Sequence, residues 1–177
     1  MAIPLRRADP THISPILRTF FVTSSIAEKR NLLQSDRSAS LFIDVLYHYR
    51  AERKYLLHGF VVMPDHFHVL ITLDSEISIE RAVQFVKGGF AFRIGKVFRF
   101  RSPVWQRGFS EARIYDSKHF SSVLEYMAGN PIKRGLAQIG KQYPYCSLHP
   151  GFELDDLPQG LKPRQILLPT GTSKDVP

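Results

Sequence analysis

The sequence predicts an α+β fold in which one antiparallel sheet packs against helices. Segments typical of strands and helices follow in the order strand, helix, strand, strand, helix, strand, with a further helix at the end. Two of the strand-like runs are separated only by Pro64 and Asp65, which indicates a hairpin and therefore antiparallel pairing. The chain of 177 residues is long enough for one domain with a substantial core.

The N-terminal part contains the first strand and the first helix. Residues 18–27 are rich in aromatic and β-branched side chains, which predicts a strand. Residues 38–54 carry apolar side chains at helical spacing, which predicts an amphipathic helix. Residues 1–17 contain three prolines among basic and polar residues and predict an irregular lead-in.

A hairpin and a long helix come next. Strand-like runs at 55–63 and 66–73 flank a Pro-Asp link, and these two residue types suit the central positions of a turn. Apolar residues at steps of three and four then predict a helix whose buried face is formed by Ile79, Val83, Val86, Phe90 and Ile94. Gly88 and Gly89 lie inside this helix, which predicts a kink, a close approach of a phosphate to the backbone, or tight packing against another helix.

The C-terminal part supplies the last strand and a further helix. Residues 102–115 predict a turn that leads into a strand, and residues 117–130 predict a helix with Ser117 as its N-cap. The resulting order is that of a ferredoxin-like antiparallel sheet (βαββαβ) with an additional C-terminal helix. The predicted segments are an irregular lead-in at 1–17, one folded domain at 18–149 and a Pro/Gly-rich tail at 150–177.

Positive charge is concentrated in one part of the chain. The formal net charge is +8, and residues 81–141 contain twelve lysines and arginines against only Glu111, Asp116 and Glu125. A basic half joined to a nearly neutral half favours a polyanionic partner, with nucleic acid the first candidate. The alternative is a basic, solvated face that serves solubility.

Cysteine and hydropathy exclude several classes of protein. Cys146 is the only cysteine, so neither an intrachain disulfide nor a cysteine-based zinc site is expected. No run approaches the ~18 apolar residues that a membrane span requires, so we expect no membrane partner and a cytosolic location.

Two histidines one residue apart stand at the start of the third strand. Because side chains alternate along a strand, His66 and His68 share one face, while Phe67 begins a wholly apolar face that must meet the helices. Two imidazoles ~6.5–7 Å apart can converge on one divalent ion, although the pair needs a third ligand. The alternative is two polar side chains on a solvated face of the sheet.

The last helix offers a tyrosine and an asparagine on one side. Tyr126 and Asn130 are four residues apart and are therefore neighbours on the helix surface. If this helix packs over the open face of the sheet, its phenol and carboxamide face the histidines. Each residue has a structural alternative: Tyr126 as a boundary aromatic, and Asn130 as the cap of a turn that begins at Pro131.

Three stretches together resemble a known family. The segments HGFVVMPDHFHVLIT, VWQRGFSEARI and LEYMAGNPIKRGLA, in this order and spacing, resemble the IS200-like Y1 transposases. Most closely they are similar to the REP-associated tyrosine transposases, a bacterial branch of the HUH (His-hydrophobic-His) single-strand nucleases. The resemblance covers residues 18–149 and implies a ferredoxin-like catalytic domain that cuts and rejoins single-stranded DNA, often next to a hairpin.

The resemblance also assigns roles to particular residues. His66 and His68 match the HUH metal ligands, Tyr126 matches the catalytic tyrosine, and Asn130 stands where the family offers a further ligand. The implied cofactor is Mg²⁺ or Mn²⁺, and the implied intermediate is a 5′-phosphotyrosyl link. A bacterial cytoplasmic location is implied as well. The resemblance leaves open a monomer or a homodimer, and a tyrosine from the same chain or from the partner chain.

The basic segment is expected to bind the DNA. Candidates for phosphate contacts are Lys87, Arg93, Arg101, Arg107, Lys133 and Arg134. Trp105 or Phe109 is a candidate for stacking on a base, with burial in the core as the alternative for Trp105. Two rival functions are an RRM-like binding module without catalysis and a metal-dependent nuclease that uses water.

Overall fold

The computed structural model describes residues 17–101, 103–157 and 161. Its centre is a four-stranded antiparallel sheet with the strand order β2-β3-β1-β4, as the ferredoxin-like prediction requires. The strands are β1 (Arg18–Ser25), β2 (Leu56–Met63), β3 (His66–Leu73) and β4 (Ser110–Ile114). Almost all of the predicted lead-in and most of the predicted tail lie outside the described residues.

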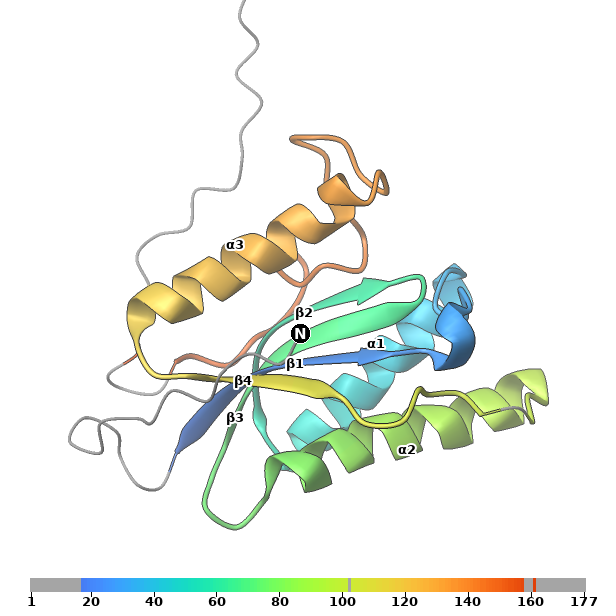
Figure 1. Ribbon diagram of the computed structural model, residues 1–177, viewed down its shortest axis with the longest axis horizontal. Helices are drawn as coiled ribbons and strands as arrows, with labels where there is room; N and C mark the ends of the chain where they lie inside the picture. The colour runs from blue at the N-terminus through green and yellow to red at the C-terminus, as the bar shows by residue number, and fades with distance from the viewer. Residues whose placement is uncertain (1–16, 102, 158–160, 162–177) are drawn as a thin grey trace, which may run out of the picture.

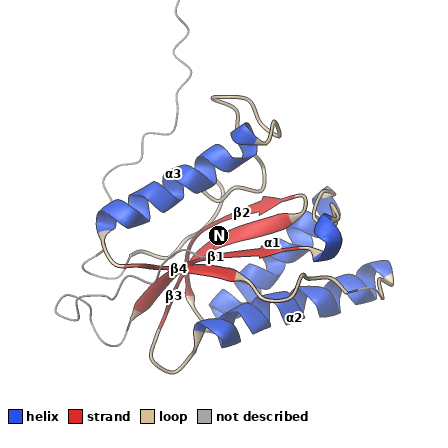
Figure 2. Ribbon diagram, viewed as in Figure 1, coloured by secondary structure: helices blue, strands red, loops and turns tan. Residues whose placement is uncertain are grey.

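Helices cover both faces of this sheet. Helices α1 (Asp36–Ala51) and α2 (Ile79–Phe98) lie on one face, and α3 (Ser117–Lys133) lies alone on the other (Figure 1, Figure 2). A short 3₁₀ helix, η2 (Ala27–Lys29), follows β1. Within the described part of the chain, none of the helices combines the length and apolarity needed to cross a bilayer.

Two apolar cores fill the spaces between these layers. The core under α1 and α2 contains Phe42, whose ring contacts those of Phe67 and Phe90. The core under α3 contains Leu70 of β3 and Met127 of the helix. The alternation predicted for β3 is therefore confirmed, because Phe67 and Leu70 belong to opposite cores. The face that carries the histidines is covered by α3.

The helix boundaries differ from the predicted ones for identifiable reasons. Helix α1 begins earlier than expected because the Ser35 hydroxyl caps it, accepting a hydrogen bond from the Ser38 backbone N–H at 3.2 Å. The N-cap of α3 is Asp116 rather than Ser117, since its carboxylate accepts from the His119 N–H at 2.7 Å.

The glycine pair in α2 is explained by helix packing. A Cβ on Gly89 would lie 2.7 Å from Cε2 of Tyr49 and 3.1 Å from Cγ1 of Val45, so α1 approaches α2 closely at this point. A Cβ on Gly88 would have no heavy atom within 4 Å. Helix α2 runs without a break, so the expected kink is wrong, and tight packing is confirmed for Gly89 only. A close approach of a phosphate stays a prediction.

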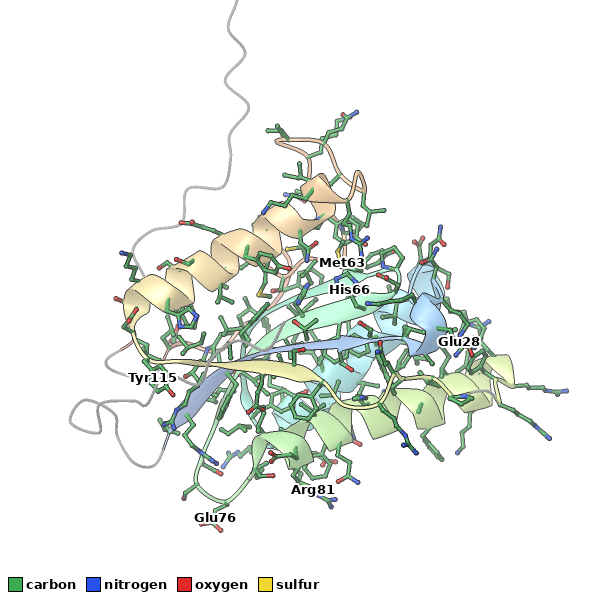
Figure 3. All side chains as sticks on the ribbon, viewed as in Figure 1. Glu28, Met63, His66, Glu76, Arg81 and Tyr115 are labelled. Carbon is green, nitrogen blue, oxygen red and sulfur yellow. The ribbon has the colours of Figure 1, made fainter. Side chains whose placement is uncertain are left out.

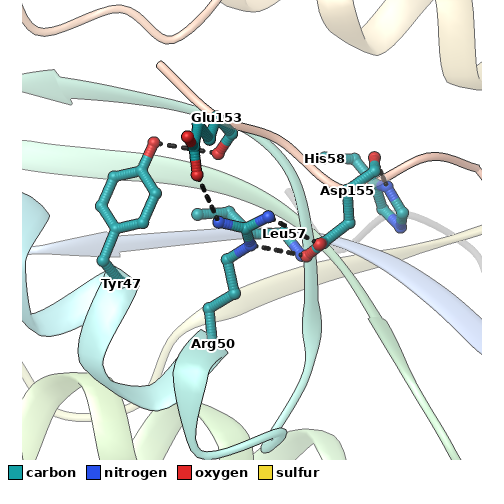
Figure 4. A network of polar contacts seen from close by, with 6 residues as sticks. All are labelled: Tyr47, Arg50, Leu57, His58, Glu153 and Asp155. Carbon is teal, nitrogen blue, oxygen red and sulfur yellow. Dashed lines mark hydrogen bonds and ion pairs between the residues drawn. The ribbon is translucent and has the colours of Figure 1, made fainter.

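The segment after α3 returns to the sheet and covers its edge at β2. The Val62 N–H of β2 donates a hydrogen bond to the Tyr145 carbonyl of this segment. The Ser147 N–H of the segment donates to the Phe60 carbonyl of β2, and both distances are 2.9 Å. The Asp155 carboxylate accepts two hydrogen bonds from the Arg50 guanidinium, at 2.8 and 2.9 Å (Figure 4). Pairing at this edge removes the unsatisfied backbone groups that would otherwise invite aggregation.

Candidate active site

Both histidines of β3 are buried beneath α3. His66 is 7% exposed and His68 is 3% exposed, so the alternative of a solvated pair is wrong. His66 lies at the same end of the sheet as Glu28, away from the end where Glu76 and Tyr115 lie (Figure 3). The two imidazole rings meet edge to face, with 4.9 Å between their centroids.

His68 is held by one neighbour on each ring nitrogen. Its Nδ1 atom is 2.6 Å from Oγ1 of Thr23, the residue opposite it on β1, and its Nε2 atom is 2.7 Å from the amide nitrogen of Asn130. Because an amide nitrogen only donates, Nε2 accepts, and Nδ1 carries the proton that is donated to Thr23. The lone pair of Nε2 therefore faces α3.

His66 is held by the residue that precedes it. Its Nδ1 atom is 2.6 Å from the carboxylate of Asp65, which also contacts the Arg134 guanidinium at 3.5 Å. Donation from Nδ1 to the carboxylate leaves the lone pair on Nε2, the arrangement that carboxylates impose on metal-binding histidines. Both histidines thus have the tautomer that a metal ligand of the Nε2 type needs.

Burial keeps both imidazoles neutral. Burial lowers the pKa of His68 to about 3, and the charge of Arg134, like that of His66 when protonated, acts in the same direction. Burial also lowers the pKa of His66, although the Asp65 carboxylate opposes this. Burial alone would raise the pKa of Asp65, but the hydrogen bond from His66 and the charges of Arg134 and Lys29 bring it below its usual value. A neutral imidazole is the form that binds a metal ion.

Tyr126 of the same chain lies against the histidine pair. Its ring meets His68 edge-on at 5.4 Å between centroids, and it meets Phe21 in the same way at 5.9 Å. The Lys133 ammonium is 5.7 Å from the centre of the tyrosine ring. Tyr126 is 44% exposed, and no residue that the structure describes hydrogen-bonds its phenol oxygen. The hydroxyl is thus accessible to a substrate that reaches the histidines.

Asn130 completes the set because α3 does not stop before Pro131. The helix continues to Lys133, so the alternative in which Asn130 caps a following turn is wrong. Asn130 is 7% exposed, and its carboxamide reaches the Nε2 atom of His68. A rotation of this amide would turn its oxygen toward the space now filled by its nitrogen.

The donor set fits a cation of the Mg²⁺ or Mn²⁺ type. Among the described residues, no three His, Cys, Asp or Glu side chains gather into a group that could hold a metal ion. The protein ligands would therefore be two neutral imidazoles and one carboxamide oxygen. Imidazole and amide oxygen are ligands that Mn²⁺ accepts, and the remaining positions suit water or phosphate.

The predicted DNA-binding residues differ in how exposed they are and in whether they already bind other parts of the protein. Lys133 and Arg134 are exposed at the end of α3 beside the histidines, and Arg101 and Arg107 are also exposed. Arg93 is half-buried. Lys87 donates hydrogen bonds to the carbonyls of Gln106 and Gly108, at 3.0 and 2.7 Å. Lys87 thus secures a loop of the protein, and contact with DNA remains a prediction for it as for the others.

Trp105 lies at the edge of the core. Its ring contacts Phe42, Phe67 and Phe90, and its indole N–H donates to the Lys87 carbonyl at 2.8 Å. Phe109 packs against the same core. These contacts favour the core alternative for Trp105 over stacking on a base.

Sequence patterns did not reveal the residues that orient the histidines. Thr23 becomes a partner of His68 only through the register of β1 with β3, which no local pattern specifies. Asp65 was visible as the neighbour of His66, but its role in the turn already accounted for it. The electrostatic effect of Lys29 on Asp65 and His66 was not predicted either. Lys29 lies in the short η2 helix with a φ of 55°, in the left-handed region, and no sequence pattern indicated this turn.

The fold and the site together define the class of protein. A histidine pair on an antiparallel sheet, closed by a helix that brings a tyrosine and an asparagine, corresponds to the HUH class of single-strand nucleases. The family model described as "Transposase IS200 like" matches residues 20–130. The chain belongs to this family of IS200-like transposases.

Curated relatives agree with this membership. A REP-associated tyrosine transposase of Escherichia coli is 23% identical over 146 residues, which cover 82% of this chain and 82% of the relative. A protein of Haemophilus influenzae, provisionally assigned as a REP-associated tyrosine transposase, is 26% identical over 145 residues, which cover 72% of this chain and 82% of the relative.

Solved structures share the fold. A REP-associated tyrosine transposase bound to a REP hairpin superposes with a TM-score of 0.64 at 19% identity, covering 92% of this chain and 99% of that one. A provisionally assigned transposase of Deinococcus radiodurans superposes with a TM-score of 0.52 at 17% identity, covering 71% of this chain and 97% of that one.

Proposed function

We propose that this chain is a single-stranded DNA endonuclease and strand transferase that acts on DNA containing a hairpin. The main support is geometric: the ring of Tyr126 meets His68 edge-on, and the Nε2 atom of His68 is 2.7 Å from the Asn130 amide. A nucleophile and three ligands of the metal-binding type therefore meet within one chain. Membership of the IS200-like family and the similar structure bound to a REP hairpin support the same class of substrate.

Tyr126 is the proposed nucleophile. Its phenol oxygen attacks the phosphorus in line with the 3′ oxygen, so that an Oη–P bond forms while the P–O3′ bond breaks. The phenol proton passes to solvent and the departing 3′ oxygen takes up a proton. The products are a 5′-phosphotyrosyl link and a free 3′-hydroxyl. No water is consumed, so attack by the 3′-hydroxyl of another strand can rejoin the DNA.

The surrounding residues prepare the site for a charged phosphate. His66, His68 and Asn130 are the residues that would hold Mg²⁺ or Mn²⁺. The bound cation would supply Lewis-acid stabilisation of the phosphate charge in the transition state. Lys133 lies over the ring of Tyr126 and Arg134 lies beside Asp65, so both add positive charge where the DNA backbone must lie.

A binding module without catalysis has less support. An RRM-like module stacks bases on an open sheet face, whereas here helix α3 covers the face that carries His68 and Leu70. A nuclease that uses an activated water is the remaining alternative, and the experiment below distinguishes it.

The test is to incubate the protein with end-labelled, single-stranded hairpin DNA and Mn²⁺ and to look for a covalent adduct on a denaturing gel. We expect an adduct with the wild type and with Tyr115→Phe, a matched control whose tyrosine is also exposed but lies at the other end of the sheet. We expect none with Tyr126→Phe. Cleavage without an adduct would support the hydrolase, and binding alone would support the module.

A further inference from the structure

An open cavity of about 430 Å³ lies between the C-terminal end of α2 and the segment that leads into α1. This volume is in the range of small-molecule pockets, ~300–1,000 Å³. The apolar part of its lining is formed by Leu32, Ile94, Phe98 and Phe100, and its polar part includes Asn31 and Gln34. None of these residues belongs to the histidine and tyrosine site.

The aromatic side of the cavity is paired with positive charge. The ring of Phe98 is 42% exposed, and the Arg37 guanidinium carbon lies 5.0 Å from its centre. The Arg30 guanidinium carbon lies 5.1 Å from the centre of the Phe100 ring. An aromatic ring with a guanidinium beside it offers both a stacking face and a charge for a phosphate, which is the chemistry of single-strand DNA binding.

The polar side of the cavity presents two carboxamides. The Ser35 hydroxyl already accepts a hydrogen bond from the Ser38 N–H, and the Ser38 hydroxyl already donates one to the Leu32 carbonyl. The side chains of Asn31 and Gln34 are exposed and make no hydrogen bond to any residue that the structure describes. Each amide offers a donor and an acceptor, the combination that reads the edge of an unpaired base.

The cavity is connected to the proposed active site through the backbone. The Leu33 N–H donates to the Pro64 carbonyl at 2.9 Å, so the segment that carries Asn31 and Gln34 is fixed to the turn before His66. Lys29 precedes this segment, and its ammonium donates at 2.8 Å to the hydroxyl of Ser25, the residue opposite His66 on β1. A positive side chain therefore lies between the histidines and the cavity.

We propose that this cavity binds one unpaired base of the DNA strand whose phosphodiester lies at Tyr126. The base would stack on Phe98, its edge would meet Asn31 and Gln34, and Lys29 would meet the backbone between the two sites. The proposal rests on the proposed function, because the ligand is the substrate of that reaction.

The test uses an oligonucleotide hairpin with single-stranded flanks in which one 2-aminopurine is moved through the flanks position by position. Stacking changes the fluorescence of this base. We expect a change at one flank position with the wild type, lost in Phe98→Ala, and affinity lowered about tenfold in that variant. Phe92→Ala is the matched control: Phe92 is on the same helix, 63% exposed and paired with Lys96 at 4.3 Å, but lies outside the cavity.

A second variant removes the polar side without touching a ring. The double variant Asn31→Ala, Gln34→Ala should keep the unfolding midpoint of the wild type and weaken binding several-fold. Equal effects of Phe98→Ala and Phe92→Ala, or the absence of a position-specific signal, would overturn the base pocket. The covalent-adduct assay separates this failure from failure of the proposed function, since an adduct at Tyr126 does not require the pocket signal.

Discussion

The two histidines are one residue apart in the chain, yet they depend on different elements for their orientation. His68 is oriented by Thr23 of the neighbouring strand, and His66 is oriented by Asp65 of the turn before it. Both partners act on Nδ1 and leave Nε2 with its lone pair. For the proposed metal site this means that both imidazoles are already oriented before a cation binds, which would reduce the cost of ordering the ligands.

Asp65 is a positioning residue whose removal should weaken metal binding. Asp65→Ala frees the Nδ1–H group of His66 and should lower Mn²⁺ affinity about 10–100-fold, the usual effect of losing such a partner. Asp65→Asn keeps an acceptor for His66 and should restore part of this affinity. Isothermal titration with Mn²⁺ measures both, with Asp44→Asn, an exposed carboxylate on α1, as control. Unchanged affinity in Asp65→Ala would show that the hydrogen bond does not orient a ligand.

Individual site residues were predictable where a local period governs them. Strand alternation put His66 and His68 on one face, and helical spacing put Tyr126 beside Asn130. Thr23 and Asp65 were not predictable, because their roles depend on the strand register and on a side-chain rotamer. A single sequence contains no local signal for either.

At the scale of elements, the contact between α1 and α2 depends on one glycine. Gly89→Ala should destabilise the fold by about 1–3 kcal/mol, because its Cβ would meet the Tyr49 ring and Val45 in a packed core. Gly88→Ala has open space and should stabilise the helix by about 0.5–1 kcal/mol. Urea unfolding of both variants gives the two free energies. Equal shifts in the same direction would contradict the packing described for Gly89.

Helix α3 illustrates where prediction of an element stops. The helix itself was predicted, but the predicted helix ended at Asn130 because proline disfavours a helix interior. The structure continues the helix through Pro131, with the Arg134 N–H bonded to the Asn130 carbonyl at 3.1 Å. Near a helix end, proline removes one hydrogen bond only. The packing of α3 over the sheet stabilises the helix enough to offset this loss.

At the scale of the whole molecule, the chain after α3 ties the sheet edge to α1. His58 lies at this junction and is 4% exposed, with Nδ1 3.0 Å from the Asp155 carbonyl oxygen and Nε2 2.7 Å from the Thr72 hydroxyl. Burial lowers the pKa of His58 below its usual value. The folded protein therefore resists protonation of this ring, although the Asp155 carbonyl and carboxylate favour it.

This burial makes the stability of the protein depend on pH. The unfolded chain binds a proton at His58 near pH 6.5, but the folded chain does not, so the free energy of unfolding should fall as the pH drops from about 7 to about 5. His58→Gln should make this fall smaller. Urea titrations at several pH values measure the slope, and an unchanged slope in His58→Gln would refute this account.

The architecture of the sheet was predicted from the order of its elements. That α3 would cover the second face of the sheet was stated only as a condition. Sequence order gives β-α-β-β-α-β and therefore the sheet. The packing of α3 over the histidines depends on contacts such as Leu70 with Met127, which join residues far apart in the chain. The docking of Asp155 on Arg50 is equally long-range, and a Pro/Gly-rich composition gave no sign of it.

The most direct test of the proposed reaction is to find which atom of the protein becomes linked to DNA. After reaction with hairpin DNA and Mn²⁺, nuclease treatment and trypsin digestion, mass spectrometry should find a nucleotide on the peptide that spans residues 119–133, which carries Tyr126. We expect a 5′-phosphate ester on the oxygen of that tyrosine. A nucleotide on another residue, or cleaved DNA with no modified peptide, would contradict it.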